Sequence, residues 1–319
     1  MRYVVGYSAN ARGRDAVNLA VSLARGRGAA LDLVVAIPEA APFNAAHAPA
    51  AGYDNYRHQQ AQEWLDEGLR LIPADVPASA HIRSGESDAQ TLIDACDEFG
   101  ADMLVIGATS NGLFKRFTVG SVAGALLHAA TVPVALAPHG YHRREALTRV
   151  SCGLGDRPGA EELLDYAVSM ATNRHVPLRV VSLLTLDEGD SAEAAETARA
   201  YAARHLAAAL PATGTPGTPG TPGGPGADGG PAAAAHPSDV VVAQGHSVEE
   251  AVDRLDWEDG EILLIGSSRL ARHRSIFLGS TANRILRALP VPMIVVPSDY
   301  ELKSPSHSTS NDPSREAQA

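Results

Sequence analysis

The sequence predicts an α/β protein built from two tandem, doubly wound domains, each with a five-stranded parallel sheet. Short β-branched apolar runs alternate with amphipathic segments along most of the 319 residues. Such alternation is typical of a parallel sheet with helices on both faces. The order of elements then repeats, and three pairs of landmarks each lie 159 positions apart: Gly107 and Gly266, Gly120 and Gly279, Pro133 and Pro292. A constant offset between unrelated features indicates internal duplication.

In the first half, predicted strands and helices alternate without exception. The strands are runs rich in valine, isoleucine and leucine, at residues 3–7, 31–37, 78–85, 102–108 and 132–138. The helices have apolar residues at three- and four-residue spacing, at 11–28, 54–72, 87–100 and 120–130. Glycines 26, 28 and 100 supply stop signals for two of these helices. Trp64, spaced with Leu65 and Leu69, is predicted to belong to the core.

The second half repeats this order. Its predicted strands lie at 149–154, 178–184, 239–245, 261–268 and 291–297, and its helices at 159–173, 191–210, 247–257 and 279–289. The domains are expected to span 1–140 and 147–299. A Gly/Pro/Thr-rich insertion at 212–237 is interpreted as a flexible spacer, with a polyproline ligand as the alternative. The polar tail, 300–319, is expected to be disordered.

Composition excludes several classes of protein. The formal net charge of −11 argues against binding of nucleic acid or an anionic membrane surface. No run approaches 18 apolar residues and no signal peptide is evident, so a cytoplasmic location without membrane contact is expected. The two cysteines, Cys96 and Cys152, fit buried structural thiols in a reducing compartment. The 12 histidines show no metal-ligand spacing, and the chain contains no P-loop and no GxSxG motif.

The loops that follow the fourth strand of each half are the candidate binding site. In a doubly wound sheet, ligands bind outside the carboxyl ends of the strands. Gly107 and Gly266 are expected to let the backbone turn sharply and lie close to a ligand. The pairs Gly120-Ser121 and Gly279-Ser280 stand where helix N-termini are predicted, and such termini attract phosphate. Both loops also carry basic residues: Lys115, Arg116, Arg269, Arg272, His273 and Arg274.

Two interpretations of these loops remain open on the residues alone. The glycines, hydroxyls and basic side chains together favour an anionic ligand, with Ser121 and Ser280 bonding a phosphate oxygen. Alternatively, Gly-Ser is only a good helix start, its serine caps the helix, and the basic residues form a solvated loop.

The stretches GATSNGLFKRFTVGS (107–121) and GSSRLARHRSIFLGS (266–280) resemble the signature of the universal stress protein family. That signature is Gly, two residues, Gly, nine residues, then Gly followed by Ser or Thr. The resemblance covers about 140 residues of each half. It implies an adenine-nucleotide alpha-hydrolase-like fold, a loop that cradles ATP or a related adenine nucleotide with or without Mg²⁺, and an Asp at the end of the first strand. It also implies pairing through fifth strands, so that a tandem chain forms an internal pseudo-dimer or associates as a homodimer.

The chain departs from the family pattern at four positions. The second loop glycine is replaced by Ser110 in the first half and Arg269 in the second, which leaves the first loop closer to the pattern. The Asp position falls on Ser8 and on Gly155, beside Asp156. The nucleotide-binding residues expected from the resemblance and the loops are Ser8, Gly107, Ser110, Gly120, Ser121, Gly266, Arg269, Gly279 and Ser280.

The predicted function is that of a cytoplasmic stress-response protein which binds ATP in one or both loops and is regulatory, not an enzyme. Two alternatives remain. The motif is vestigial and the protein is a scaffold for protein–protein contacts, or the protein is a slow ATPase or kinase, for which no catalytic base is identifiable in the sequence.

Overall fold

A computed structural model of the chain describes residues 1–39, 52–108, 120–155, 159–185, 191–210, 238–268, 275–298 and 300. The first half contains β1 (Arg2–Gly6), α1 (Ala11–Ala24), β2 (Ala30–Pro38), α2 (Gly52–Arg70), β3 (Ala78–Gly85), α3 (Asp88–Phe99), β4 (Met103–Gly107), α4 (Ser121–Ala129) and β5 (Val134–Ala137). The predicted order is confirmed. Gly26, Gly28 and Gly100 have φ of 78°, 60° and 61°, the left-handed conformation that ends a helix.

The second half contains β6 (Arg149–Gly153), α5 (Ala160–Thr172), β7 (Leu178–Thr185), α6 (Ser191–Ala209), β8 (Ser238–Gly245), α7 (Val248–Asp253), β9 (Glu261–Gly266), α8 (Ser280–Ala288) and β10 (Met293–Val296). Helix α7 is shorter than predicted. The chain leaves the helix after Asp253, and the indole N–H of Trp257 donates to the carbonyl of Val252, which in a continued helix would accept from the N–H of Asp256. The insertion predicted at 212–237 lies outside the described residues.

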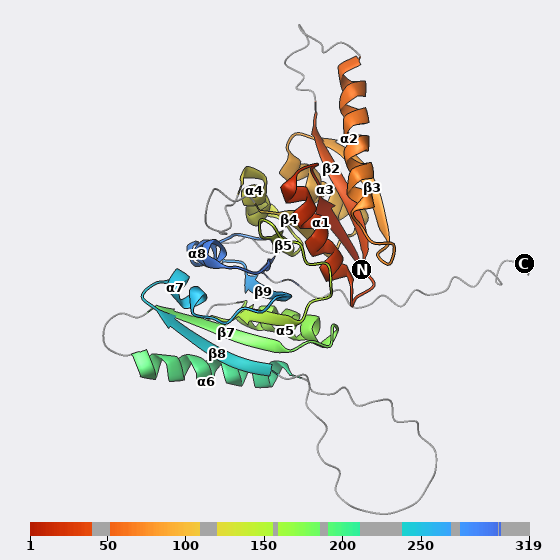
Figure 1. Ribbon diagram of the computed structural model, residues 1–319. Helices are drawn as coiled ribbons and strands as arrows, with labels where there is room; N and C mark the ends of the chain where they lie inside the picture. The colour runs from red at the N-terminus through yellow and green to blue at the C-terminus, as the bar shows by residue number, and fades with distance from the viewer. Residues whose placement is uncertain are drawn as a thin grey trace, which may run out of the picture.

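All ten strands form one sheet, in the order β3-β2-β1-β4-β5-β10-β9-β6-β7-β8. Figure 1 shows the first half, with β2 to β5, above the second half, with β7 to β9. Within each half every pairing is parallel, whereas β5 and β10 pair antiparallel, with Ala135 opposite Ile294. The seam is apolar, and the paired residues of both strands are buried. The pairing of fifth strands implied by the family resemblance is therefore confirmed within one chain.

Helix α4 joins the two halves at its C-terminal end. Its last carbonyls, of Leu127 and Ala130, accept hydrogen bonds at 3.0 Å from the backbone N–H groups of Leu278 and Ile276 in the second half. Ile276 and Leu278 are buried in the same apolar cluster as α4. The ring of Phe277 lies 4.8 Å from that of His128. The C-terminal end of α4 is thus built from both halves.

Both cysteines are buried as predicted, Cys96 on α3 and Cys152 on β6, and neither forms a disulfide. Burial raises the pKa of Cys152 to about 12, so its thiol is not reactive at neutral pH. Within the described ranges, no helix is long and apolar enough to cross a membrane.

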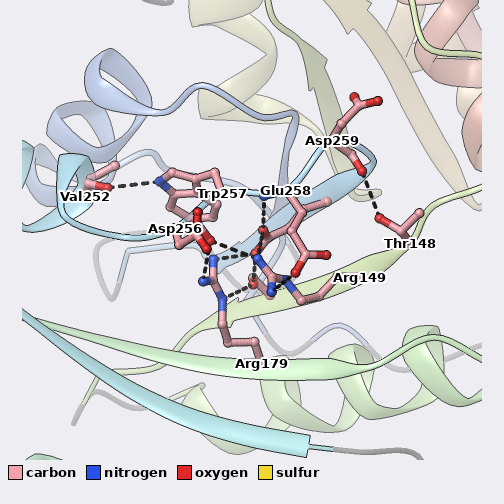
Figure 2. A network of polar contacts seen from close by, with 10 residues as sticks. Thr148, Arg149, Arg179, Val252, Asp256, Trp257, Glu258 and Asp259 are labelled. Atoms are coloured by element: carbon pink, nitrogen blue, oxygen red, sulfur yellow. Dashed lines mark hydrogen bonds and ion pairs between the residues drawn. The ribbon is translucent and has the colours of Figure 1, made fainter.

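A buried ion network lies at the N-terminal ends of β6, β7 and β9 in the second half (Figure 2). The carboxylate of Glu261 is fully buried and accepts hydrogen bonds from Arg149 (2.6 Å), Arg179 (2.5 Å) and the hydroxyl of Ser151. The guanidinium of Arg179 also lies 4.8 Å from the ring centroid of Trp257. A buried carboxylate without partners lowers the free energy of unfolding, so the stability of the second half depends on these hydrogen bonds to Glu261.

The first half has a smaller ion cluster near the N-terminal ends of β1, β2 and β3. Asp32 on β2 accepts hydrogen bonds from Arg2 at 2.6 Å and from His81 at 3.0 Å. Burial alone would raise the pKa of Asp32, but its hydrogen bonds with Arg2 and His81 outweigh that effect and lower it.

Tyr300, the first residue of the segment predicted to be disordered, packs between the two halves. Its ring meets that of Tyr166 edge-on at 5.7 Å, and its hydroxyl donates to the carbonyl of Asp102 at 3.4 Å. The rest of that segment lies outside the described residues.

The stability contributed by Tyr300 is expected to fall in alkaline solution. Burial, with the nearby charge of Asp102, raises the pKa of Tyr300 from 10.0 to about 12. The folded protein therefore favours the neutral phenol, so this contribution is complete below pH 10 and is lost as the pH rises toward 12. Tyr300→Phe keeps the ring but cannot ionise. Urea midpoints between about pH 8 and 11 should fall less steeply for Tyr300→Phe than for the unsubstituted protein, and equal slopes would contradict the expectation.

Candidate functional site

A cavity of about 280 Å³ lies at the carboxyl ends of β1, β2 and β4 in the first half. Its volume is near the lower end of the range for small-molecule pockets. It is lined by Gly6, Tyr7, Ser8, Arg12, Gly13, Val34, Val35, Ala36, Trp64, Asp88, Leu92, Ile106, Gly107, Gly120, Ser121, Val122 and Ala123. The cavity stands at the edge of the sheet where the sequence predicted a site. It brings together four of the predicted residues: Ser8, Gly107, Gly120 and Ser121.

The N-terminus of α4 opens onto this cavity without a side-chain cap. Gly120 is the N-cap residue, with φ −69° and ψ 170°, and as a glycine it has no side chain to accept a hydrogen bond from the first turn. Helix α1 differs, because the side chain of Asn10 accepts hydrogen bonds from the N–H groups of Arg12 and Gly13. Helix α3 is capped by Ser87 in the same way. The N-cap residue of α4 thus does not occupy the N–H groups of the first turn, and such groups attract anions.

Ser121 occupies the first helical position of α4, not the capping position. Its side chain is exposed and it lines the cavity. The capping role considered for this serine is therefore wrong, since the structure assigns that position to Gly120. Ser8 lines the cavity too, and its carbonyl accepts a hydrogen bond from the N–H of Asn10 at 2.7 Å. Ser110 lies outside the described residues.

Gly107 lines the cavity and is also confined by the chain itself. A Cβ atom at this position would lie 2.1 Å from the carbonyl oxygen of Arg12, so β4 ends directly against the start of α1. Gly13 is confined in the same way, with 1.9 Å between an added Cβ and the carbonyl oxygen of Ser8. Neither glycine has a positive φ. The close approach of the chain to itself is thus sufficient to require glycine at position 107.

The lining also includes Arg12, Asp88 and Trp64, none of which was predicted as a site residue. Arg12 is exposed at the start of α1 and lines the same cavity as the N-terminus of α4. Asp88, at the start of α3, supplies the one carboxylate among the lining residues described. Trp64 was predicted to lie in the core, but its side chain is 38% exposed and forms part of the cavity wall. An exposed arginine in the first turn of a helix, with Arg14 two residues later, is common at protein surfaces, so the sequence held no specific signal for Arg12.

Tyr7 lies beneath the cavity. It is almost completely buried, and its hydroxyl makes no hydrogen bond to the described part of the chain. Burial, with the charge of Glu67, raises the pKa of Tyr7, so the phenol stays neutral at physiological pH.

In the second half, the described residues on either side of the corresponding loop are hydrogen-bonded to each other. The hydroxyl of Ser267 accepts a hydrogen bond from the N–H of Phe277 at 2.7 Å, and the N–H of Ser268 donates to the carbonyl of Phe277 at 2.8 Å. Ala108 is the equivalent residue of the first half, because its N–H donates to Ala137 of β5 just as the N–H of Ser267 donates to Val296 of β10. Alanine has no hydroxyl, so the contact that Ser267 makes with Phe277 cannot form at Ala108.

The predicted site residues of the second half are only partly brought together. Gly279 caps α8 without a side-chain bond, and Ser280 is exposed at the next position. A Cβ at Gly266 would meet the side chain of Leu163 at 3.6 Å, an ordinary contact, and Gly266 has no positive φ, so neither a sharp turn nor a close approach requires glycine there. Nothing lies within 4 Å of a Cβ added at Gly155. Arg269 is outside the described residues.

Comparison with known proteins fits both halves. The sequence model of the universal stress protein family matches residues 1–138 and 147–297. The chain belongs to the universal stress protein family. A universal stress protein of Mycobacterium tuberculosis (strain ATCC 25618 / H37Rv) is 31% identical over 311 residues, which cover 93% of this chain and all of that protein.

Solved structures agree on the fold of this tandem universal stress protein. A universal stress protein from Archaeoglobus fulgidus DSM 4304 aligns with a TM-score of 0.66 at 15% identity, over 93% of this chain and 98% of that one. A protein of unknown function from Pseudomonas aeruginosa PAO1 aligns with a TM-score of 0.55 at 16% identity, over 93% and 92%. At these identities the likeness concerns the fold alone.

The two glycines at the ends of β4 and β9 are expected to differ in how strongly the same substitution affects stability. Gly107→Ala places a methyl group against the carbonyl of Arg12 and should destabilise the protein by about 1–3 kcal/mol. Gly266→Ala meets only ordinary contacts and should change stability by less than about 0.5 kcal/mol. Urea unfolding of both variants checks this pair. Equal losses would show that the close approach at Gly107 does not govern its stability.

No group of three or more histidine, cysteine, aspartate or glutamate side chains is arranged to hold a metal ion in the described parts of the chain.

Proposed function

We propose that the first half binds an adenine nucleotide, ATP or a close relative, in the cavity at the start of α4. Binding is regulatory and not catalytic, and it takes place in the cytoplasm. The single observation that carries this proposal is the uncapped N-terminus of α4 opening onto the cavity beside Arg12. Membership of the universal stress protein family supports a role in stress response. The resemblance of residues 107–121 to the family signature supports the choice of an adenine nucleotide.

The phosphate groups fit the end of the cavity formed by α4. N–H groups in the first turn of a helix and the helix dipole both favour negative charge. The hydroxyl of Ser121 is exposed at this end and can donate a hydrogen bond to a phosphate oxygen. The guanidinium of Arg12 adds a full positive charge to a protein whose formal net charge is −11. The cavity therefore attracts an anion through α4, Ser121 and Arg12, although the protein as a whole is acidic.

Mg²⁺ would enter with the nucleotide. It binds through phosphate oxygens and one or two carboxylates, and keeps several water ligands. Asp88 is the carboxylate that the described lining residues offer. Because Asp88 is alone, it supports a phosphate-bound cation and not a resident metal centre.

A regulatory role is favoured over catalysis. General base catalysis needs a group within hydrogen-bond reach of the attacking nucleophile. Apart from Asp88, the described lining contains no histidine, lysine, cysteine or glutamate. The cavity can therefore hold a nucleotide with few groups able to activate water.

One nucleotide per chain is proposed, bound in the first half. In the second half the hydroxyl of Ser267 and the N–H of Ser268 are both used by Phe277. A phosphate group there would have to displace these hydrogen bonds. Arg269 adds a large side chain at the position of a family glycine.

Nucleotide bound to the purified protein tests the proposal directly. The full chain is heat-denatured and the released small molecules are separated by anion exchange, and ATP is then titrated calorimetrically into nucleotide-free protein with and without Mg²⁺. The expected result is an adenine nucleotide in the released fraction and saturable binding at one site per chain. No saturable binding at millimolar ATP would overturn the proposal.

The alternative function is a scaffold that acts through protein contacts alone. It is favoured by the four departures from the family pattern: Ser8, Ser110, Gly155 and Arg269. The same titration distinguishes the two functions, because a scaffold with a vestigial motif gives no heat of binding.

A further inference from the structure

We infer that Trp64 is the residue that recognises the nucleobase, by stacking its indole ring on the base. This inference rests on the proposed function, since it concerns the same cavity. It assigns the ligand class as a phosphate carrying an aromatic base, in preference to a sugar phosphate or a polyphosphate. The argument depends on where α2 places this side chain.

Helix α2 faces the sheet with a narrow buried stripe that includes Ala61, Leu65 and Gly68. Trp64 is three residues after the first of these and four before the last, so it lies beside the stripe on the adjacent edge of the helix. Its side chain is 38% exposed. Few large apolar side chains of the described chain are so exposed, and among them Trp64 lines the cavity.

Close packing holds α2 at this point. A Cβ atom at Gly68 would lie 2.9 Å from the side chain of Leu33 and 3.0 Å from the ring of Tyr7. The backbone of α2 therefore rests directly on residues of β2 and of the turn after β1, one helical turn from Trp64. An indole carried on such a fixed element is held in place before a ligand arrives, which reduces the entropy lost on binding.

The cavity is lined by two kinds of group. The first turn of α4 and Arg12 supply hydrogen-bond donors and positive charge. The apolar lining residues, at the ends of β2 and β4 and on α3, are Val34, Val35, Ala36, Leu92 and Ile106, and Trp64 of α2 lines the same cavity. A nucleotide also carries both kinds of group, an anionic chain and a flat apolar base. Every nucleobase presents a π face, and a tryptophan ring is a favourable surface for it.

The test compares three proteins: the unsubstituted chain, Trp64→Ala and Trp64→Phe. Each is titrated calorimetrically with ATP and with inorganic tripolyphosphate, which carries the phosphates without a base. Trp64→Ala should weaken ATP binding roughly 5- to 150-fold, the range expected for loss of one base–aromatic stack. Trp64→Phe should stay within about fivefold, since an aromatic ring remains. Tripolyphosphate should bind all three proteins equally.

Fluorescence provides an independent reading, because the chain has only two tryptophans. Trp257 belongs to the ion network of the second half, where its indole N–H donates to the carbonyl of Val252. ATP should therefore change the emission of the Trp257→Phe variant, in which Trp64 is the reporter, and tripolyphosphate should not. If Trp257→Phe does not fold, the difference in emission between the unsubstituted protein and Trp64→Phe gives the same information.

The possible failures are distinguishable. Equal ATP affinity in Trp64→Ala and the unsubstituted protein overturns the stacking role while the proposed function stands. Equal losses of ATP and tripolyphosphate in Trp64→Ala also overturn it, because they show a general effect on the cavity. Absence of ATP binding by the unsubstituted protein overturns the proposed function, and this inference with it.

Discussion

Replacing Gly120 with aspartate is expected to abolish nucleotide binding without lowering the stability of the protein. Gly120 caps α4 with φ −69° and ψ 170°, an extended conformation that aspartate adopts readily at this position. The new carboxylate would accept hydrogen bonds from the first turn of α4 and gain a few tenths of a kcal/mol over glycine. It would also occupy the place of the phosphate. Like charges 4 Å apart near a protein surface repel by about 4 kcal/mol, so ATP affinity should fall at least about a hundredfold.

Gly279→Asp is the matched control, since Gly279 caps α8 with nearly the same backbone angles, φ −70° and ψ 169°. It introduces the same charge at the corresponding helix of the second half. With one nucleotide bound per chain, in the first half, this variant should bind ATP as the unsubstituted protein does. Calorimetric titration and thermal unfolding of both variants measure the two effects separately. Weakened binding in Gly279→Asp alone would place the site in the second half.

Glu261→Gln is expected to destabilise the protein by about 3–5 kcal/mol, the cost of removing one partner from a buried ion pair. Glu261 is fully buried and holds two arginines, Arg149 and Arg179, of which Arg179 is itself buried. The glutamine side chain cannot neutralise them. For a domain of this size the loss corresponds to a fall in melting temperature of roughly 6 to 20 °C, measurable by calorimetry.

Two further variants show whether burial of charge is the cause. Glu196→Gln breaks the exposed pair with Arg199 on α6 and should change stability by less than about 0.5 kcal/mol. The double variant Arg179→Met with Glu261→Leu removes both charges and should be more stable than Glu261→Gln alone, because no buried charge of that pair is left uncompensated. A double variant less stable than the single one would show that the network is needed for its hydrogen bonds as well as its charge balance.

The fold could be predicted from the sequence because its signals are local. Each strand is a short apolar run and each helix has its own periodicity, so neither requires knowledge of distant residues. The pairing of the two halves could be predicted from the duplication together with the resemblance to a family whose domains pair through their fifth strands. Where a distant contact decided the outcome, the prediction was wrong. Helix α7 ends early, where Trp257 packs against Arg179 of β7 and its indole N–H takes the carbonyl of Val252.

The candidate site was only partly predictable for the same reason. The Gly-Ser pairs could be found because helix N-termini have a sequence signature. The position of Trp64 could not, because apolar spacing does not distinguish the centre of a buried stripe from its edge. Gly107 was assigned to a ligand, but the nearest atoms to an added Cβ belong to Arg12 of the same chain. The difference between Ala108 and Ser267 was visible in the sequence, but its meaning depends on Phe277, ten residues after Ser267.

The antiparallel seam between β5 and β10, with α4 ending against Ile276 and Leu278, makes each half the permanent partner of the other. Two separate chains would form such a pair only above their dissociation constant, whereas a covalent link keeps the partner present at any dilution. In a symmetric homodimer each substitution is present in both sites. In this chain Ser267 accepts a hydrogen bond from Phe277 in the second half, whereas the equivalent Ala108 of the first half has no hydroxyl to do so. The fused architecture thus lets one half specialise in its ligand while the other serves as its fixed support.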